Sequence, residues 1–347
     1  MTTALGLLLV VLAGLGTGTI AWPMKMMKRF RFEHYWFVAM LAGLVLIPWI
    51  VVLSSVSRPF AAYGQVPWPT LVKSNLFGIG WGIANVLYGV SVVRIGAALT
   101  GAILTGLGIA VGVTLPMLYK ASGLFRDAPG LGSPAGLAVM AGLVVMLAGV
   151  VIVSMAGFGR ERAMAGSPAA PARSSRGFLG SLVMCAAAGV LSAGSSFSFI
   201  YSQGPIVEAM KARGAGDLAA NMAVWAAALS GGALVNVLYP AWIMTRDRSW
   251  ALLKSGGRDL VLAAALGAQF ILSVNLLGRG MVLLGALGAS IGFGIQQAMQ
   301  LLGNQAVGFL SGEWHGVRGT PRRQMIASLA VILAAVAIMA YGKALTP

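Results

Sequence analysis

Residues 136–155 read GLAVMAGLVVMLAGVVIVSM, an apolar stretch without a single charged residue. A helix rises about 1.5 Å per residue, so about 20 apolar residues cross the roughly 30 Å hydrocarbon core of a bilayer. Gly142 and Gly149 within it are small residues of the kind that let helices approach closely in lipid. We therefore predict a membrane-spanning helix here.

The composition of the whole chain has the same character. Of its 347 residues, 58% are hydrophobic and 9% are charged, and the mean hydropathy is +0.87. An ordinary soluble domain carries roughly a quarter charged residues, so a soluble fold is excluded. The net charge is +16, and the Lys and Arg residues that produce it lie between apolar runs. This placement indicates contact with anionic lipid headgroups and not with nucleic acid.

Further segments of spanning length predict an all-α integral membrane protein with ten transmembrane helices. The ten predicted spans are residues 4–23, 35–56, 70–93, 95–119, 136–155, 178–201, 217–244, 260–277, 281–310 and 324–341. The polar stretch 157–177, rich in Pro, Ser, Ala and Arg, reads as a cytoplasmic linker. It divides the chain into a first five-helix half, residues 1–156, and a second, residues 178–347.

The basic residues predict the orientation of these spans. The connections after helices 1, 3, 5, 7 and 9 hold 16 of the 24 Lys and Arg residues, beginning with Lys25, Lys28, Arg29 and Arg31. Positive charge favours the cytoplasmic side. We therefore expect both termini in the periplasm of a bacterial inner membrane.

An odd number of helices in each half predicts two repeats of inverted orientation, as in many secondary transporters. A shift of the chain that sets Asn85 against Gln269 also sets Gly101 against Gly285. These matches favour two inverted five-helix repeats.

Signatures of enzymes and of cofactor or metal sites are missing. The sequence contains no HExxH, no Walker loop with its Lys and no GxSxG in a strand–turn–helix context. The single cysteine, Cys185, sits in an apolar run, which rules out a disulfide framework. We predict neither catalysis nor a cofactor, and the sequence carries no signature of an oligomeric state.

Uncharged polar residues within the spans are the candidates for binding a substrate. Gln296, Gln300 and Asn304 are four residues apart, which puts three amides on one helix face. Amides both donate and accept hydrogen bonds, as sugar hydroxyls require. The other candidates are Trp81, Asn85, Tyr88, Ser196 and Gln269. The alternative is that these groups make interhelical hydrogen bonds, worth about 0.6 kcal/mol each.

The acidic residues all fall at predicted helix ends or in loops. Glu33 with His34, and Glu313 with His315, form two acid–histidine pairs at predicted cytoplasmic ends. Each pair is either a protonation site reached from the cytoplasm or a set of solvated end charges.

The stretch WGIANVLYG at residues 81–89, followed by Arg94 and Gly96, resembles the L-rhamnose/proton symporter family of the drug/metabolite transporter superfamily. Phe32-Glu33 after a basic loop, Gln269-Phe270 and Gly312-Glu313-Trp314 add to this resemblance. It implies two inverted five-helix repeats around a central cavity and uptake of a deoxy sugar with a proton by alternating access. The positions that match the family pattern are Glu33, Asn85, Tyr88, Arg94, Gln269 and Glu313.

Two other functions remain open at the level of the sequence. Related superfamily members export metabolites or lipophilic cations, and a chain of this type can also act as a membrane sensor that binds a ligand without moving it. The predicted ninth helix departs from the family pattern, because residues 285–292 stand where the family has aromatic residues and an Asp.

Overall fold

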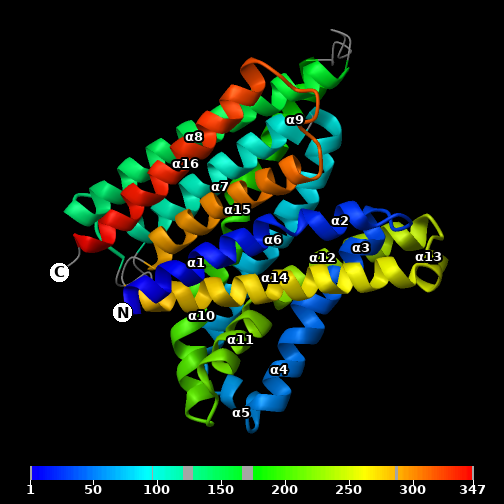
Figure 1. The fold of residues 1–347 in the computed structure, drawn as a ribbon. Coiled ribbons are helices and arrows are strands. Elements are labelled where there is room, and N and C mark those ends of the chain that lie inside the picture. The colour runs from blue at the N-terminus through cyan, green and yellow to red at the C-terminus, as the bar shows by residue number, and fades with distance from the viewer. Residues whose placement is uncertain (1, 96, 120–127, 166–174, 286–287, 346–347) are drawn as a thin grey trace.

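The computed structural model describes residues 2–95, 97–119, 128–165, 175–285 and 288–345. These residues form helices joined by turns, and no strand occurs among them (Figure 1). Residues 166–174, the middle of the predicted linker, lie outside the described residues.

The helices are named as in Figure 1, where η marks a π-helical segment. In chain order they are α1 (Thr2–Gly18), α2 (Ala21–Met26), α3 (Phe32–Met40), η1 (Leu41–Leu46), α4 (Ile47–Ser55), α5 (Pro59–Tyr63), α6 (Trp68–Ile95), α7 (Ala97–Leu118), α8 (Pro134–Ala165), α9 (Ser175–Ser192), α10 (Gly194–Lys211), α11 (Asp217–Ala228), α12 (Ser230–Arg246), α13 (Ala251–Ser255), α14 (Gly257–Leu284), η4 (Gly288–Gly292), α15 (Phe293–Leu310) and α16 (Thr320–Ala344).

Within the described residues, eight helical segments are long and apolar enough to cross a membrane, and nine if α11 and α12 form one bent span. The prediction of an all-helical membrane protein is therefore confirmed. Helix α15 is not among these segments because its Gln and Asn side chains lower its hydropathy. The count of ten stays a prediction.

Several spans are interrupted near their middle. Helices α11 and α12 meet at Leu229 with a bend of 57°, and α9 gives way to α10 at Ala193. The second span, Phe32–Ser55, passes through the π-helical segment η1 just before Pro48. A break of this kind frees backbone groups and re-aims the following turn.

Glycines allow the helices to cross closely at two places. A Cβ atom on Gly43 would lie 2.5 Å from the carbonyl oxygen of Gly267, and one on Gly232 would lie 2.6 Å from that of Gly78. Real Cβ atoms do not approach so closely, so only glycine fits. The second span thus packs against α14, and α12 packs against α6, backbone to backbone.

The two ends of the bundle differ in what they carry. The chain termini lie at one end, whereas α2, the start of α3 and α13 lie at the other (Figure 1). Helix α1 runs alongside α14, and α8 runs alongside α16. The cavity described next reaches the end that carries α2.

Candidate substrate-binding cavity

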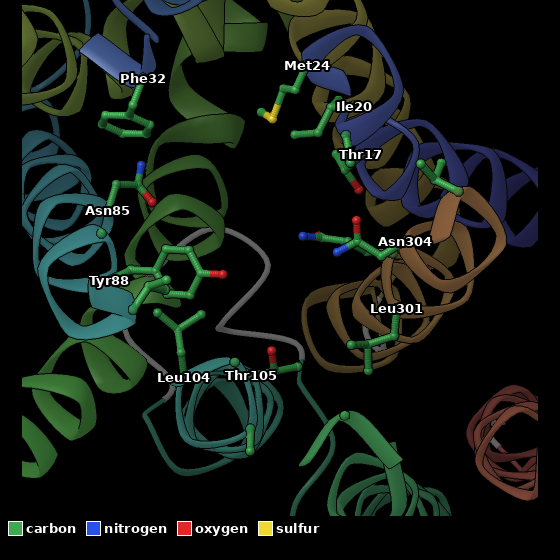
Figure 2. Close-up of a pocket in the computed structure, with 18 of the residues that line it drawn as sticks. Thr17, Ile20, Met24, Phe32, Asn85, Tyr88, Leu104, Thr105, Leu301 and Asn304 are labelled. Carbon is green, nitrogen blue, oxygen red and sulfur yellow. The ribbon is translucent and has the colours of Figure 1, made fainter. Parts of the chain in front are cut away.

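A cavity of about 960 Å³ is lined by residues of α1, α2, α3, α6, α7, α8, α9, α12, α15 and α16. Binding sites for small molecules measure roughly 300–1,000 Å³. Its inner end is lined by Thr17, Asn85, Tyr88, Thr105 and Gln300. In Figure 2, Asn85 and Tyr88 of α6 face Thr17 of α1 and Asn304 of α15 across the open space.

Asn85 is held by a hydrogen-bonded group on three helices. Its Nδ2 donates to Oδ1 of Asn236 at 3.0 Å, and Nε1 of Trp36 donates to the same oxygen at 3.0 Å. Asn236 is buried, and its own Nδ2 donates to the carbonyl of Gly232 at 2.9 Å. The side-chain oxygen of Asn85 is therefore the part of its amide that is left to accept a hydrogen bond from a ligand.

Gln300 is oriented from the opposite wall. Nε2 of the buried Gln296 donates to Oε1 of Gln300 at 2.9 Å and to Oγ1 of Thr17 at 2.9 Å. With its oxygen engaged, Gln300 offers its NH₂ group to the cavity. The two walls thus present an acceptor and a donor.

Besides Gln296, which lies behind the wall and does not line the cavity, three predicted binding residues lie away from it. Nε2 of Gln269 donates to the carbonyl oxygen of Gly16 at 2.8 Å and to Oγ1 of Thr19 at 2.9 Å, which ties α14 to the end of α1. Trp81 is buried with its ring stacked on Phe270, the ring centroids 5.9 Å apart. Ser196 is buried, and its hydroxyl has no hydrogen-bond partner among the described residues. None of the three lines the cavity.

Glu313 lies at the mouth of the cavity in an ion-pair cluster. It pairs with Lys25 of α2 and, at 2.5 Å, with Nη1 of Arg160 of α8. The guanidinium of Arg160 also stands over the Trp314 ring, 5.5 Å from its centroid. Partial burial by itself would raise the pKa of Glu313, but the hydrogen bonds from Lys25 and Arg160 outweigh it and lower the pKa. The cluster therefore joins three separate segments through an ionised carboxylate.

Glu33 lies in a different setting, in the first turn of α3. It is buried, and its Oε1 is 3.4 Å from Nδ1 of His34, which is fully buried. Nε2 of His34 is 3.0 Å from the carbonyl oxygen of Ser249. Glu33 itself does not line the cavity, although Phe32 and Trp36 on either side of it do.

Comparison with known proteins places the chain. Residues 1–344 match the family model described as L-rhamnose-proton symport protein. The chain belongs to this family. The family assignment made from the sequence is thereby confirmed, as is the prediction of a transporter and not an enzyme.

Individual relatives in the symporter family match at moderate identity. An L-rhamnose-proton symporter of Pectobacterium atrosepticum is 30% identical over 338 residues, which is 93% of each chain. One from Yersinia pestis bv. Antiqua is 33% identical over 224 residues, 62% of this chain and 60% of its own. The crystal structure of another protein matches with a TM-score of 0.55 at 16% identity over 96% of this chain and 95% of that one. At that identity the match shows a shared fold.

Sequence reasoning missed Asn236, which orients Asn85. It was detectable, because Asn236 is a polar residue deep in the predicted span 217–244, the criterion that selected the other candidates. What the sequence lacks is the pairing of Asn236 with Asn85 and Trp36, since these residues are far away along the chain.

Proposed function

We propose that this member of the symporter family imports L-rhamnose, or a closely related deoxy sugar, together with a proton by alternating access. The names of its relatives support the substrate and the coupling ion. The observation that carries the proposal is the pairing of an acceptor at Asn85 with a donor at Gln300 across the cavity. A neutral molecule with several hydroxyl groups can satisfy both walls at once.

The charges of the cavity fit a neutral substrate. The described residues that line its inner end carry amides and hydroxyls and no ionised group. At the mouth, Glu313 is paired with Lys25 and Arg160, and Glu161 is exposed. A carrier of cations would be expected to place a buried carboxylate at the inner end of the path. This distribution therefore favours sugar uptake over the export of lipophilic cations.

We also propose ten spans in two inverted repeats, with α15 as the ninth span. The two glycine crossings support this arrangement. The distance along the chain from Gly43 to Gly232 equals the distance from Gly78 to Gly267, and we call this distance the repeat separation. The crossing of Gly43 with Gly267 therefore has the same register as that of Gly232 with Gly78. Equivalent contacts at an equal separation are what two copies of one folding unit would make.

A further pair of contacts is related by the repeat separation. A Cβ atom on Gly267 would lie 2.2 Å from the carbonyl oxygen of Ala39, and one on Gly78 would lie 2.7 Å from that of Ala228. Ala39 and Ala228 are again one repeat separation apart. A chance resemblance between glycine-rich helices would not preserve both contacts at both crossings.

The orientation proposed for these spans places the α2 end in the cytoplasm. That end carries the basic cluster Lys25, Lys28, Arg29 and Arg31, which anionic headgroups of the inner leaflet would attract. The termini would then be periplasmic, and the cavity would face the cytoplasm. The structure would accordingly correspond to the state that releases sugar into the cell.

For the proton, we propose the pair Glu33 and His34 as the first site and Glu313 as the second. If Nε2 of His34 donates to Ser249, its Nδ1 is the free position for a proton, directed at Glu33. Burial of both side chains shields this proton from water. Because Phe32 and Trp36 flank the pair and line the cavity, a shift of α3 would couple protonation to sugar binding.

Counterflow of labelled L-rhamnose in proteoliposomes tests the proposal. Proteoliposomes preloaded with unlabelled L-rhamnose should exchange it for labelled sugar, with deoxy sugars competing better than fully hydroxylated aldoses or polyols. Saturating sugar should also stabilise the folded protein, by about 2.7 kcal/mol at one hundred times its Kd. A protein that is stabilised but does not exchange would be a sensor. Absence of both effects at millimolar sugar would contradict the sugar assignment.

A further inference from the structure

A second set of polar side chains is buried away from the cavity. Asn221 and Trp225 of α11 are 4% and 1% exposed, and Asn275 of α14 is 1% exposed. Nδ2 of Asn221 donates to the backbone carbonyl of Asn275 at 2.9 Å. Among the described residues, Nε1 of Trp225 and Oδ1 of Asn275 have no hydrogen-bond partner. Burying such groups unpaired costs free energy, so their presence requires an explanation.

These residues form one closely packed group. The Trp225 ring stacks on Phe199 with a centroid distance of 4.5 Å. A Cβ atom on Gly278 would lie 2.5 Å from the Phe199 ring and 2.9 Å from Oδ1 of Asn221. Helices α10, α11 and α14 are thus closed against one another here. We call Asn221, Trp225, Asn275 and Gly278 the second polar cluster.

The second polar cluster lies toward the opposite end of α14 from the cavity mouth. Asp259, in the first turn of α14, accepts hydrogen bonds from the backbone N–H groups of Lys28, Arg29 and Phe30 in the α2–α3 connection. Asn275 is about four turns farther along the same helix, toward the end of the molecule where the chain termini lie (Figure 1).

The repeat separation relates the second polar cluster to the cavity. The residues that lie one repeat separation before its four members are, in the same order, Phe32, Trp36, Val86 and Gly89. All four of these residues line the cavity. The second polar cluster therefore occupies the positions that, in the other repeat, form an open wall.

We propose that the second polar cluster is a binding surface for the sugar on the opposite side of the membrane, which opens when the cavity closes. This inference rests on the proposed function. Nε1 of Trp225 is a donor and Oδ1 of Asn275 is an acceptor, and both lack a partner that a sugar hydroxyl would supply. The Trp225 ring adds an apolar face for the C–H groups of a monosaccharide. The ligand class is a neutral hydroxylated monosaccharide.

Cysteine accessibility tests this proposal directly, because Cys185 is the only cysteine in the chain. In a Cys185→Ala background, Asn221→Cys would report the second polar cluster. Leu284→Cys is the matched control. Leu284 is buried like Asn221, at 1% exposure, and lies nearer the end of α14. The residue one repeat separation before it, Ile95, does not line the cavity.

A membrane-impermeant maleimide is added to the periplasmic side of oriented vesicles. We expect Asn221→Cys to react at least tenfold faster than Leu284→Cys, and saturating L-rhamnose to slow the reaction. Equal rates at the two positions, or no reaction at Asn221→Cys in protein that carries out rhamnose counterflow, would overturn the inference. Failure of counterflow in the unsubstituted protein would instead contradict the proposed function.

Trp225→Phe gives a second measurement that does not depend on labelling. It keeps an aromatic ring against Phe199 and removes the N–H group, which has no partner among the described residues. We expect thermal stability close to wild type and an apparent affinity for external sugar at least fivefold weaker, with the affinity from the cavity side changed less. An equal loss of affinity on both sides, or no change, would overturn the inference.

Discussion

Asn85 and Gln269 both carry amide side chains, but their surroundings indicate different roles. Asn85 lines the cavity, whereas Gln269 donates hydrogen bonds to Gly16 and Thr19 at the end of α1. We predict that Asn85→Leu lowers specific uptake at least tenfold and costs only its one hydrogen bond to Asn236, about 0.6 kcal/mol of stability. Gln269→Leu should lower stability more, because it loses two bonds to the α1 segment, and should change uptake per folded protein little. Uptake per folded protein and thermal midpoints in detergent measure both. Unchanged uptake by folded Asn85→Leu would contradict its place in the site.

Glu33 is the residue on which proton coupling is proposed to depend. Glu33→Gln keeps the size and hydrogen-bonding capacity of the side chain but removes its titration beside His34. We predict loss of pH-driven sugar accumulation with counterflow retained, because exchange needs no net proton movement. Glu313→Gln is the comparison. Should Glu313→Gln show this pattern and Glu33→Gln not, the proton site would move to the cavity mouth.

The ion-pair cluster of Glu313 predicts a pH dependence of stability. Because the folded state lowers the pKa of Glu313, its contribution is complete above the unfolded value of about 4.3 and disappears as the pH falls through the lower folded pKa. The thermal midpoint of wild type should therefore exceed that of Glu313→Gln at pH 6 and above. The difference should shrink below about pH 4.

Glu161→Gln controls for this effect, since it removes an exposed carboxylate beside Arg160 at the same end of α8. Its midpoint should follow wild type more closely than that of Glu313→Gln does. A difference between wild type and Glu313→Gln that stays constant with pH would show that the ion pairs do not stabilise the fold.

At the scale of helices, the glycine crossings make a steric prediction. Gly267→Ala would place a Cβ atom 2.2 Å from the carbonyl oxygen of Ala39, which only a shift of a backbone can relieve. We expect a loss of several kcal/mol, as for other overpacked interiors, which cost about 1–3 kcal/mol or more. Gly257→Ala, on the same helix with open space around it, should be tolerated. Thermal midpoints that agree between the two variants would contradict the close crossing.

Helix positions followed from hydropathy, but their breaks and their register did not. The bend at Leu229 comes directly before Ser230-Gly231-Gly232, residues that permit a kink. The apolar run continues on both sides of them, so hydropathy alone does not place the bend. The shift that sets Asn85 against Gln269 is slightly shorter than the repeat separation of the glycine contacts. Helices rich in Gly and Ala match at several shifts, and only contacts between helices distinguish them. The same limit explains why Gln269 was placed in the site: spacing identifies a polar face without saying what it meets.

At the scale of the whole molecule, composition predicted the protein class and the family motifs predicted a sugar transporter. The sequence could not predict the cavity itself, because ten of the described helices, from both halves of the chain, line it. Its two polar walls come from residues in different halves of the sequence, Asn85 and Gln300. Such a site exists only once the halves have packed.

Uptake driven by a pH gradient tests the central claim, proton-coupled import of L-rhamnose. Purified protein is reconstituted in liposomes with an acidic exterior, and labelled L-rhamnose is added outside. The proposal predicts accumulation above the external concentration, collapsing to equilibrium when a protonophore is added. Uptake that only equilibrates, with or without the gradient, would contradict proton coupling, and no uptake at all would contradict sugar import.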